Sequence, residues 1–190
     1  MTWKRKTPAK TAGPLRAESA WAWVFTPRKP GEKRYWLVKS EPTTFSFDDL
    51  LARPNQTTCW DGVRNHTART FMRDGMKLGD PVFFYHSNAE PSAIVGICEV
   101  VREGYPDHTA LDRKDAHFDP GSDPRDPTWF MVDLKAVRRL PRPLPLPELR
   151  ARKDLAGMAL LRIGRLSVTP VRQEEWEIII SMAGSRGQST

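Results

Sequence analysis

The sequence PVFFYHSNAEPSAIVGICEVV, residues 81–101, predicts two neighbouring strands joined by a short loop. Residues 81–87 and 92–101 are rich in aromatic and β-branched side chains, which favour strands. Residues 88–91 contain Asn and Pro, which favour a turn between them. We therefore expect these two strands to form the central pair of a sheet.

The segments on either side predict further short strands and helices. Strands are expected at 35–40, 129–137 and 165–171. Ser46 is expected to cap a short helix that runs to about residue 53, and Asn65 is expected to cap a helix over about 66–74. Further helices are expected at 147–152, 154–161 and 174–183. The residues 57–65, TTCWDGVRN, predict a turn before the second helix. This order favours an α+β fold, a small, strongly bent mixed β-barrel with peripheral short helices, over a regularly alternating doubly wound sheet.

The length of 190 residues fits one domain with an extension. Prolines, basic residues and small residues without periodicity predict a mostly disordered extension over residues 1–33, in which the short segment WAWVF, 21–25, can dock on the domain. We expect the domain to span 34–184 and residues 185–190 to be a disordered tail. Deletion of residues 1–33 is expected to leave the domain folded.

The net charge of +7 is located in the extension. Residues 1–34 hold nine basic and two acidic side chains, so residues 35–190 are formally neutral. The neutral part is still polarised, because residues 99–133 hold nine acids and four bases whereas residues 135–172 hold ten bases and two acids. A basic face built from the second segment would attract phosphates, although the same bases can instead pair with the acidic segment.

Several function classes have no support in the sequence. No phosphate-loop, dinucleotide, hydrolase or zinc signature is present, and the two cysteines and four histidines are scattered, so we expect no metal and no cofactor. No apolar run approaches the roughly 20 residues of a membrane span, and no signal peptide is expected. The Arg- and Pro-rich composition favours a bacterial, cytoplasmic protein, with the nucleus expected for a eukaryotic source. We favour a monomer.

Large flat or polar-tipped side chains gather at the predicted ends of elements: Trp36, Lys39 and Ser40 on the first strand, then Trp60–Asn65 and Tyr85–Asn88. A flat aromatic side chain beside amides and hydroxyls suits a nucleobase, because indole rings stack on bases and polar groups read the edge of an unstacked base. Each residue also has a simpler interpretation. Trp60 can be a core residue, Lys39 a solvated charge at a strand end, and Asn65 a helix cap.

Five segments of the sequence resemble the EVE domain family: YWLVKSEP (35–42), CWDGVRN (59–65), FMRDGMKLGDPVFFYHSN (71–88), GICEVVREGYPDHTA (96–110) and LRIGRLSVTPV (161–171). The resemblance implies a PUA-like β-barrel, akin to the YTH domains that hold N6-methyladenosine in an aromatic cage and to the SRA domains that flip modified cytosine. It also implies a non-catalytic reader of a modified base, methylated or hydroxymethylated, in DNA or RNA.

By resemblance to the YTH pattern, base contacts are expected from the first strand, from the Trp60 segment and from the end of the central strand. A second aromatic or apolar wall is expected from Tyr85, Trp36 or Leu161. The complete set of candidate pocket residues is Trp36, Lys39, Ser40, Trp60, Val63, Arg64, Asn65, Tyr85, His86, Ser87, Asn88 and Leu161. The candidate phosphate contacts are Arg138, Arg139, Arg162 and Arg165.

The alternative is an enzyme that acts on a nucleoside or a base-like small molecule. In that interpretation His86 or His66 would serve as the general base near neutral pH.

Overall fold

The computed structural model describes residues 21–185. The predictions for residues 1–20 and 186–190 lie outside the described residues.

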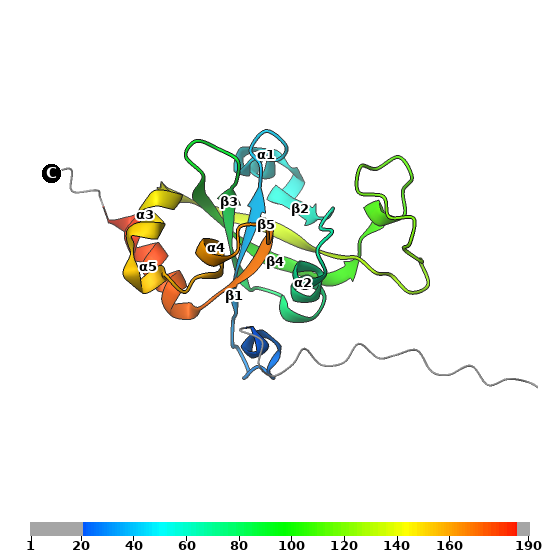
Figure 1. Ribbon diagram of the computed structural model, residues 1–190, viewed down its shortest axis with the longest axis horizontal. Coiled ribbons are helices and arrows are strands. Elements are labelled where there is room, and N and C mark those ends of the chain that lie inside the picture. Colours follow the sequence, from blue (N-terminus) through cyan, green and yellow to red (C-terminus); the bar gives the residue numbers. More distant parts are fainter. Residues whose placement is uncertain (1–20, 186–190) are drawn as a thin grey trace, which may run out of the picture.

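Six strands form one mixed sheet in the order β2-β5-β4-β3-β1-β6 (Figure 1). The strands are β1 (Tyr35–Ser40), β2 (Thr57–Trp60), β3 (Pro81–His86), β4 (Ala93–Pro106), β5 (Phe130–Pro145) and β6 (Val168–Val171). β1 and β3 pair in parallel and every other neighbouring pair is antiparallel. The mixed sheet with short helices matches the expected class. Its end strands β2 and β6 do not pair with each other, so hydrogen bonds leave the bent sheet open.

Short helices fill the connections between the strands. The α-helices are α1 (Phe47–Ala52), α2 (His66–Thr70), α3 (Leu146–Ala151), α4 (Ala159–Arg162) and α5 (Gln173–Gly184). The 3-10 and π turns are η1 (Ala22–Phe25), η2 (Pro54–Gln56), η3 (Phe71–Gly75), η4 (His108–Ala110) and η5 (Lys153–Leu155). Both predicted caps are confirmed, since Ser46 forms a capping box with Asp49 and Asn65 accepts hydrogen bonds from the backbone of Thr67 and Ala68.

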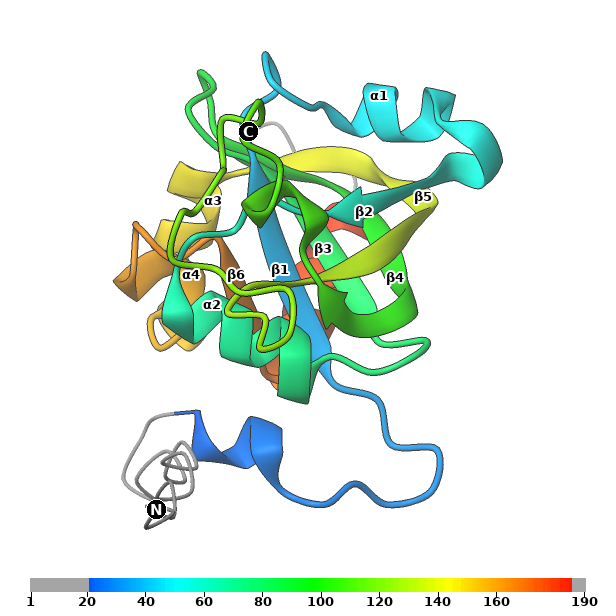
Figure 2. The same ribbon diagram turned by 90° about the vertical axis from the view of Figure 1, so that its right-hand side faces the viewer.

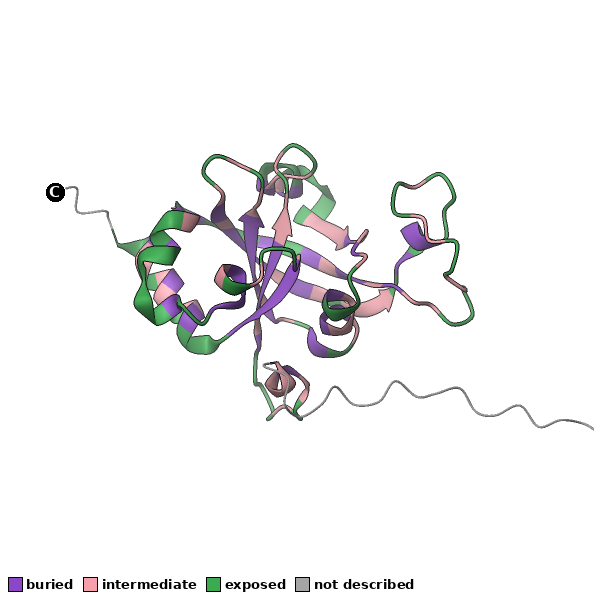
Figure 3. Cartoon of the chain, in the orientation of Figure 1, coloured by how far each residue is buried: buried purple, intermediate pink, exposed green. Residues whose placement is uncertain are grey.

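The two faces of the sheet carry separate apolar clusters, and consecutive residues of a strand point to opposite faces. Trp36 and Phe84 belong to the first cluster, which α1, α2 and η3 cover. Leu37 and Tyr85 belong to the second cluster, which α3, α4 and α5 cover. Figure 3 shows the buried central strands between these layers.

Two strand predictions need correction. The segment TTCW, 57–60, is the edge strand β2 and not part of a turn, because it pairs with residues 132–135 of β5. β5 continues to Pro145, well past the predicted end at 137. Three prolines are tolerated there because β2 leaves the later part of β5 as an open edge, where a missing N–H breaks no ladder.

In the structure, residues 21–33 form η1 and a largely exposed loop that leads into β1 (Figure 2). Val24 is buried in the first cluster. The Arg34 guanidinium donates to the carbonyl oxygens of Val24 and Thr26, and Arg28 forms an ion pair of 2.6 Å with the buried Asp80. WAWVF therefore docks at the foot of β1.

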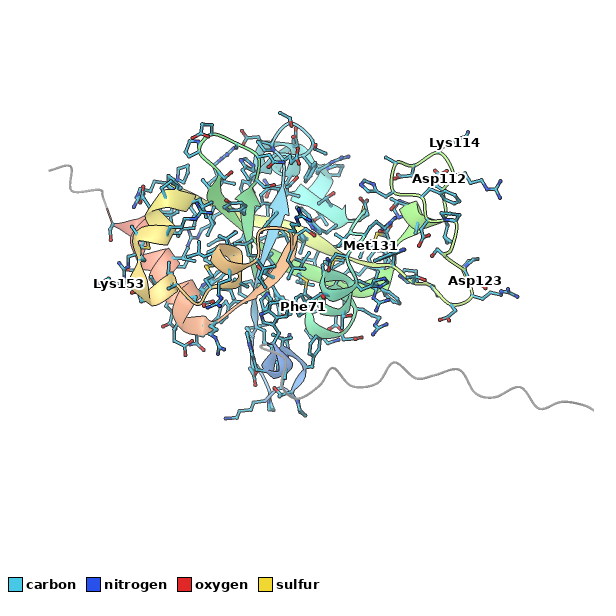
Figure 4. The ribbon with its side chains drawn as sticks, viewed as in Figure 1. Phe71, Asp112, Lys114, Asp123, Met131 and Lys153 are labelled. Carbon is cyan, nitrogen blue, oxygen red and sulfur yellow. The ribbon has the colours of Figure 1, made fainter. Side chains whose placement is uncertain are left out.

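An excursion over residues 107–129 leaves the sheet between β4 and β5. Its base is closed by the Asp107 backbone N–H, which donates to the Trp129 carbonyl over 2.9 Å. Asp112, Lys114 and Asp123 point outward from it (Figure 4). Within residues 21–185, no helix is both long enough and apolar enough to span a membrane.

Candidate functional site

A cavity of about 450 Å³ opens on the first face of the sheet, where β1 ends and β2 passes into the α2 turn. Its volume lies within the range of about 300–1,000 Å³ typical of small-molecule sites. The lining residues come from β1 and the loop after it, from Arg53, from β2 and the following turn, from the excursion and from the residue before β6. They are Lys39, Ser40, Thr44, Phe45, Arg53, Thr58, Cys59, Trp60, Asp61, Gly62, Val63, Arg64, His117 and Ser167.

Trp60 lines this cavity and is also a core residue. Its side chain is 8% exposed, and its ring meets Phe84 edge to face with centroids 5.4 Å apart. The contact with Phe84 fixes the indole on the sheet, and the part that remains accessible forms cavity wall. The two interpretations of Trp60 from the sequence are therefore compatible.

The turn after Trp60 is held by the excursion. Gly62 has φ of +71° and donates its N–H to Asp107 Oδ2 over 2.9 Å. Arg64 donates to the same oxygen over 2.7 Å, to Thr109 Oγ1 and to the His117 carbonyl. A side chain at position 62 would meet the His117 ring at 2.9 Å, so glycine suits this position both for its φ and for the close approach.

Asp107 is the centre of this arrangement. Its side chain has no solvent exposure, and Thr109 donates to its other oxygen through both the backbone N–H and the hydroxyl. Burial alone would raise the pKa of the Asp107 carboxyl, but the hydrogen bonds from Thr109 and Arg64 outweigh burial and lower the pKa below its usual value. The carboxylate is therefore charged at neutral pH and fixes the turn.

The end of β1 supplies Lys39 and Ser40. The Lys39 ammonium donates to the carbonyl oxygens of Ile163 and Gly164 over 3.3 and 3.0 Å, which leaves one of its three donors for a ligand. Burial lowers the pKa of Lys39. The Ser40 hydroxyl donates to the Phe45 carbonyl over 2.7 Å and so shapes the loop that brings Phe45 into the wall.

Positive charge borders the cavity on several sides. Lys39, Arg53 and Arg64 line it, and Arg53 lies over the Phe45 ring at 5.6 Å from the centroid. Arg162 and Arg165 are exposed and flank the Ile163 and Gly164 carbonyls that hold Lys39. Of the four predicted phosphate contacts, these two lie next to a lining residue.

Arg138 and Arg139 lie on β5 beside α1, where Arg139 pairs with Asp48 and covers the Phe47 ring. No ion pair joins the 135–172 segment to the acidic excursion within residues 21–185. The excursion instead pairs with Arg64 through Asp107.

All three predicted candidates for the second wall lie away from the cavity. Trp36 points to the correct face but is fully buried at the far end of the sheet, where its Nε1 donates to Asp80 over 2.9 Å. Tyr85 follows Phe84 and points to the opposite face because side chains alternate along a strand. Leu161 on α4 packs against that opposite face as well.

Four other predicted pocket residues do not line the cavity and have local hydrogen-bond partners. Asn65 is exposed and caps α2. His86 accepts a hydrogen bond from the Phe47 backbone, Ser87 donates its backbone N–H to Ser40, and Asn88 donates its amide to Glu41 over 2.6 Å. The cavity thus brings together five of the twelve predicted residues: Lys39, Ser40, Trp60, Val63 and Arg64.

Comparison with known proteins places this architecture in a family. Residues 34–182 match the EVE domain. The chain belongs to the EVE domain family. Thymocyte nuclear protein 1 of mouse is 43% identical, with 94% of this chain and 88% of the mouse protein covered.

Solved structures of two relatives share the EVE domain fold. The crystal structure of the human THYN1 protein in complex with 5-methylcytosine-containing DNA is 42% identical, with a TM-score of 0.78 and coverage of 81% of this chain and 99% of that chain. A Pseudomonas putida protein is 40% identical, with a TM-score of 0.74 and coverage of 78% and 99%.

Several lining residues of this EVE domain were missed by sequence reasoning. Cys59 and Asp61 stand within the motif CWDGVRN, so the motif located them without giving them a role. Burial and, to a smaller extent, Asp61 together raise the pKa of the Cys59 thiol to about 12, so the thiol stays protonated and donates to Asp61. Phe45, His117 and Ser167 lie on loops, and only the fold brings these loops to the cavity. In the described part of the chain, no cluster of His, Cys, Asp or Glu side chains is arranged to hold a metal ion.

Proposed function

We propose that this EVE domain is a non-catalytic nucleic-acid-binding module whose cavity holds a modified base of DNA or RNA against Trp60. The observation that carries the proposal is an indole wall in a base-sized cavity bordered by Lys39, Arg53 and Arg64. The human relative in complex with 5-methylcytosine-containing DNA supports a methylated cytosine as the base to test first.

The roles follow from the positions of the side chains. Trp60 offers a stacking surface, a contact worth roughly 1–3 kcal/mol per base. Lys39, with Arg162 and Arg165 near it, and Arg53 would contact the phosphates next to the bound base. Arg138 and Arg139 are proposed to contact the backbone further away.

Titration of DNA that carries one 5-methylcytosine tests the proposal. Trp60→Leu keeps an apolar side chain but removes the ring, and we expect it to weaken binding about 5- to 150-fold, the equivalent of the stacking energy. Because Trp60 also contacts Phe84, circular dichroism must first show that the variant is folded at the titration temperature.

Trp176→Leu is the matched control. Trp176 stacks on Phe83 on the opposite face of the sheet and does not line the cavity. It is expected to bind like the wild type. Wild-type affinity in a folded Trp60→Leu protein would disprove the assignment of the pocket.

The enzyme alternative finds little support in the geometry. His86 accepts its hydrogen bond from the Phe47 backbone, and His66 stacks on Trp129 at 4.9 Å between centroids. Neither histidine lines the cavity, so the alternative lacks its expected base there.

We further propose that the protein acts as a monomer. Its relatives come from mouse and from Pseudomonas putida, so the proposed location remains the cytoplasm for a bacterial source and the nucleus for a eukaryotic one.

A further inference from the structure

Asp61 is the one carboxylate among the described residues that line the cavity. It follows Trp60 directly, so consecutive residues supply the indole wall and the carboxylate. Asp61 is half-buried, and the hydrogen bond it accepts comes from the Cys59 thiol over 3.1 Å. A thiol is a weak donor, and an ionised carboxylate offers about four acceptor positions.

Asp61 differs in this respect from the other carboxylates that fix this fold. Asp80 and Asp107 are fully buried and each accepts several hydrogen bonds, including one or more from an arginine. No ion pair joins Asp61 to a basic side chain within residues 21–185. Asp61 lines the cavity, and within residues 21–185 no hydrogen bond other than the one from Cys59 uses its carboxylate.

An ionised carboxylate only accepts hydrogen bonds, and this restricts what it can recognise on a base. Cytosine presents an amino group at C4, whereas thymine presents a carbonyl oxygen at the same position. Thymine also carries the same C5 methyl group as 5-methylcytosine. The two bases therefore have nearly the same shape, and the polarity at C4 and at the neighbouring N3 separates them.

We infer that Asp61 is a specificity-determining residue that accepts a hydrogen bond from the C4 amino group of the bound base, so that the cavity selects 5-methylcytosine over thymine. The inference rests on the proposed function, since it requires a base in this cavity. A carbonyl oxygen against the carboxylate would leave two acceptors facing each other, and such mismatched polar contacts strongly disfavour the wrong ligand.

The test uses two DNA duplexes that differ at one position, 5-methylcytosine or thymine, each placed opposite an abasic site so that no base pair differs between them. The wild type is expected to bind the 5-methylcytosine duplex at least about fivefold more tightly. Asp61→Asn keeps the shape and adds an amide donor. It is expected to weaken binding of 5-methylcytosine, to strengthen binding of thymine and to bring the affinity ratio to about 1 or below.

Asp112→Asn is the control for charge. Asp112 is exposed on the excursion and does not line the cavity, so this variant removes one negative charge and should leave the ratio unchanged. The inference would be overturned if Asp61→Asn left the affinity ratio of the two duplexes unchanged, or if it raised the affinity for both duplexes equally, as Asp112→Asn should. The proposed function would stand in either case. Binding of both duplexes that does not respond to Trp60→Leu would overturn the proposed function itself.

Discussion

Replacing Asp107 with Asn tests whether the excursion fixes the turn that forms the cavity wall. One oxygen of Asp107 accepts from Thr109, and the other accepts from the Gly62 N–H and from Arg64 over 2.9 and 2.7 Å. An asparagine keeps one oxygen for Thr109, but its amide group then faces two donors. Gly62 and Arg64 both lose their acceptor.

The expected cost follows from the burial of these partners. Removing one member of a buried ion pair typically costs about 3–5 kcal/mol. Arg64 softens this loss, because its side chain is 21% exposed and keeps Thr109 Oγ1 and the His117 carbonyl as acceptors. We therefore expect Asp107→Asn to lower the free energy of unfolding by about 2–4 kcal/mol at pH 7.

Urea denaturation at several pH values measures this effect. The folded-state pKa of Asp107 is lowered, so its contribution to stability is complete above the unfolded pKa of about 4 and is lost as the pH falls through the folded pKa. The stability gap between the wild type and Asp107→Asn should therefore narrow below about pH 4. Glu148→Gln is the control, since its ion pair with Arg142 is exposed and worth at most about 1 kcal/mol. A loss below 1 kcal/mol for Asp107→Asn, or a stability gap that does not change with pH, would refute the role of Asp107 in fixing the turn at Gly62.

Two further predictions concern stability away from the cavity. Gly104→Ala should lower the free energy of unfolding by about 1–3 kcal/mol. The new Cβ would meet backbone atoms of Met72 and Arg73 at 2.7 Å, and backbone atoms cannot move away as the end of a flexible side chain can. Gly157→Ala, with open space around it, is the control in thermal melts. Equal melting of the two variants would show that the η3 backbone does not pack closely against Gly104. Deleting residues 1–33 should cost at least about 3 kcal/mol more than deleting residues 1–20, because only the longer deletion removes Arg28 from the buried Asp80. Equal urea midpoints of the two deletions would show that residues 21–33 add nothing to stability. The shorter deletion removes five bases and one acid, so it should flatten the salt dependence of DNA binding.

The sequence predicts the strands well where side-chain type is decisive. The runs at 35–40 and 81–86 are rich in aromatic and β-branched residues, and both are strands as expected. β2 was missed because an edge strand of four residues is too short to show a period, and its pairing with β5 depends on chain more than 70 residues away. The helix caps at Ser46 and Asn65 were predictable because a capping side chain bonds to backbone N–H groups only two or three residues away.

The cavity was harder to predict than the fold because it depends on which face each side chain takes. Phe83, Phe84 and Tyr85 are all buried, so the apolar run that identifies β3 does not say which residue faces the cavity. No local pattern in the excursion indicated that its first residue, Asp107, would accept a hydrogen bond from the turn at Gly62. The second aromatic in the lining, Phe45, comes from a loop without periodicity.

The rigidity of Trp60 determines where selectivity must arise in the proposed reader. Phe84 holds the indole in place before any ligand binds, so stacking requires little ordering of the protein. Stacking also tolerates every base, because each base has a π-face. Discrimination must therefore come from the polar groups around the indole, and Asp61 lies on the turn that Asp107 fixes. Loosening that turn with Asp107→Asn should reduce the preference for 5-methylcytosine over thymine more than it reduces the affinity for DNA as a whole.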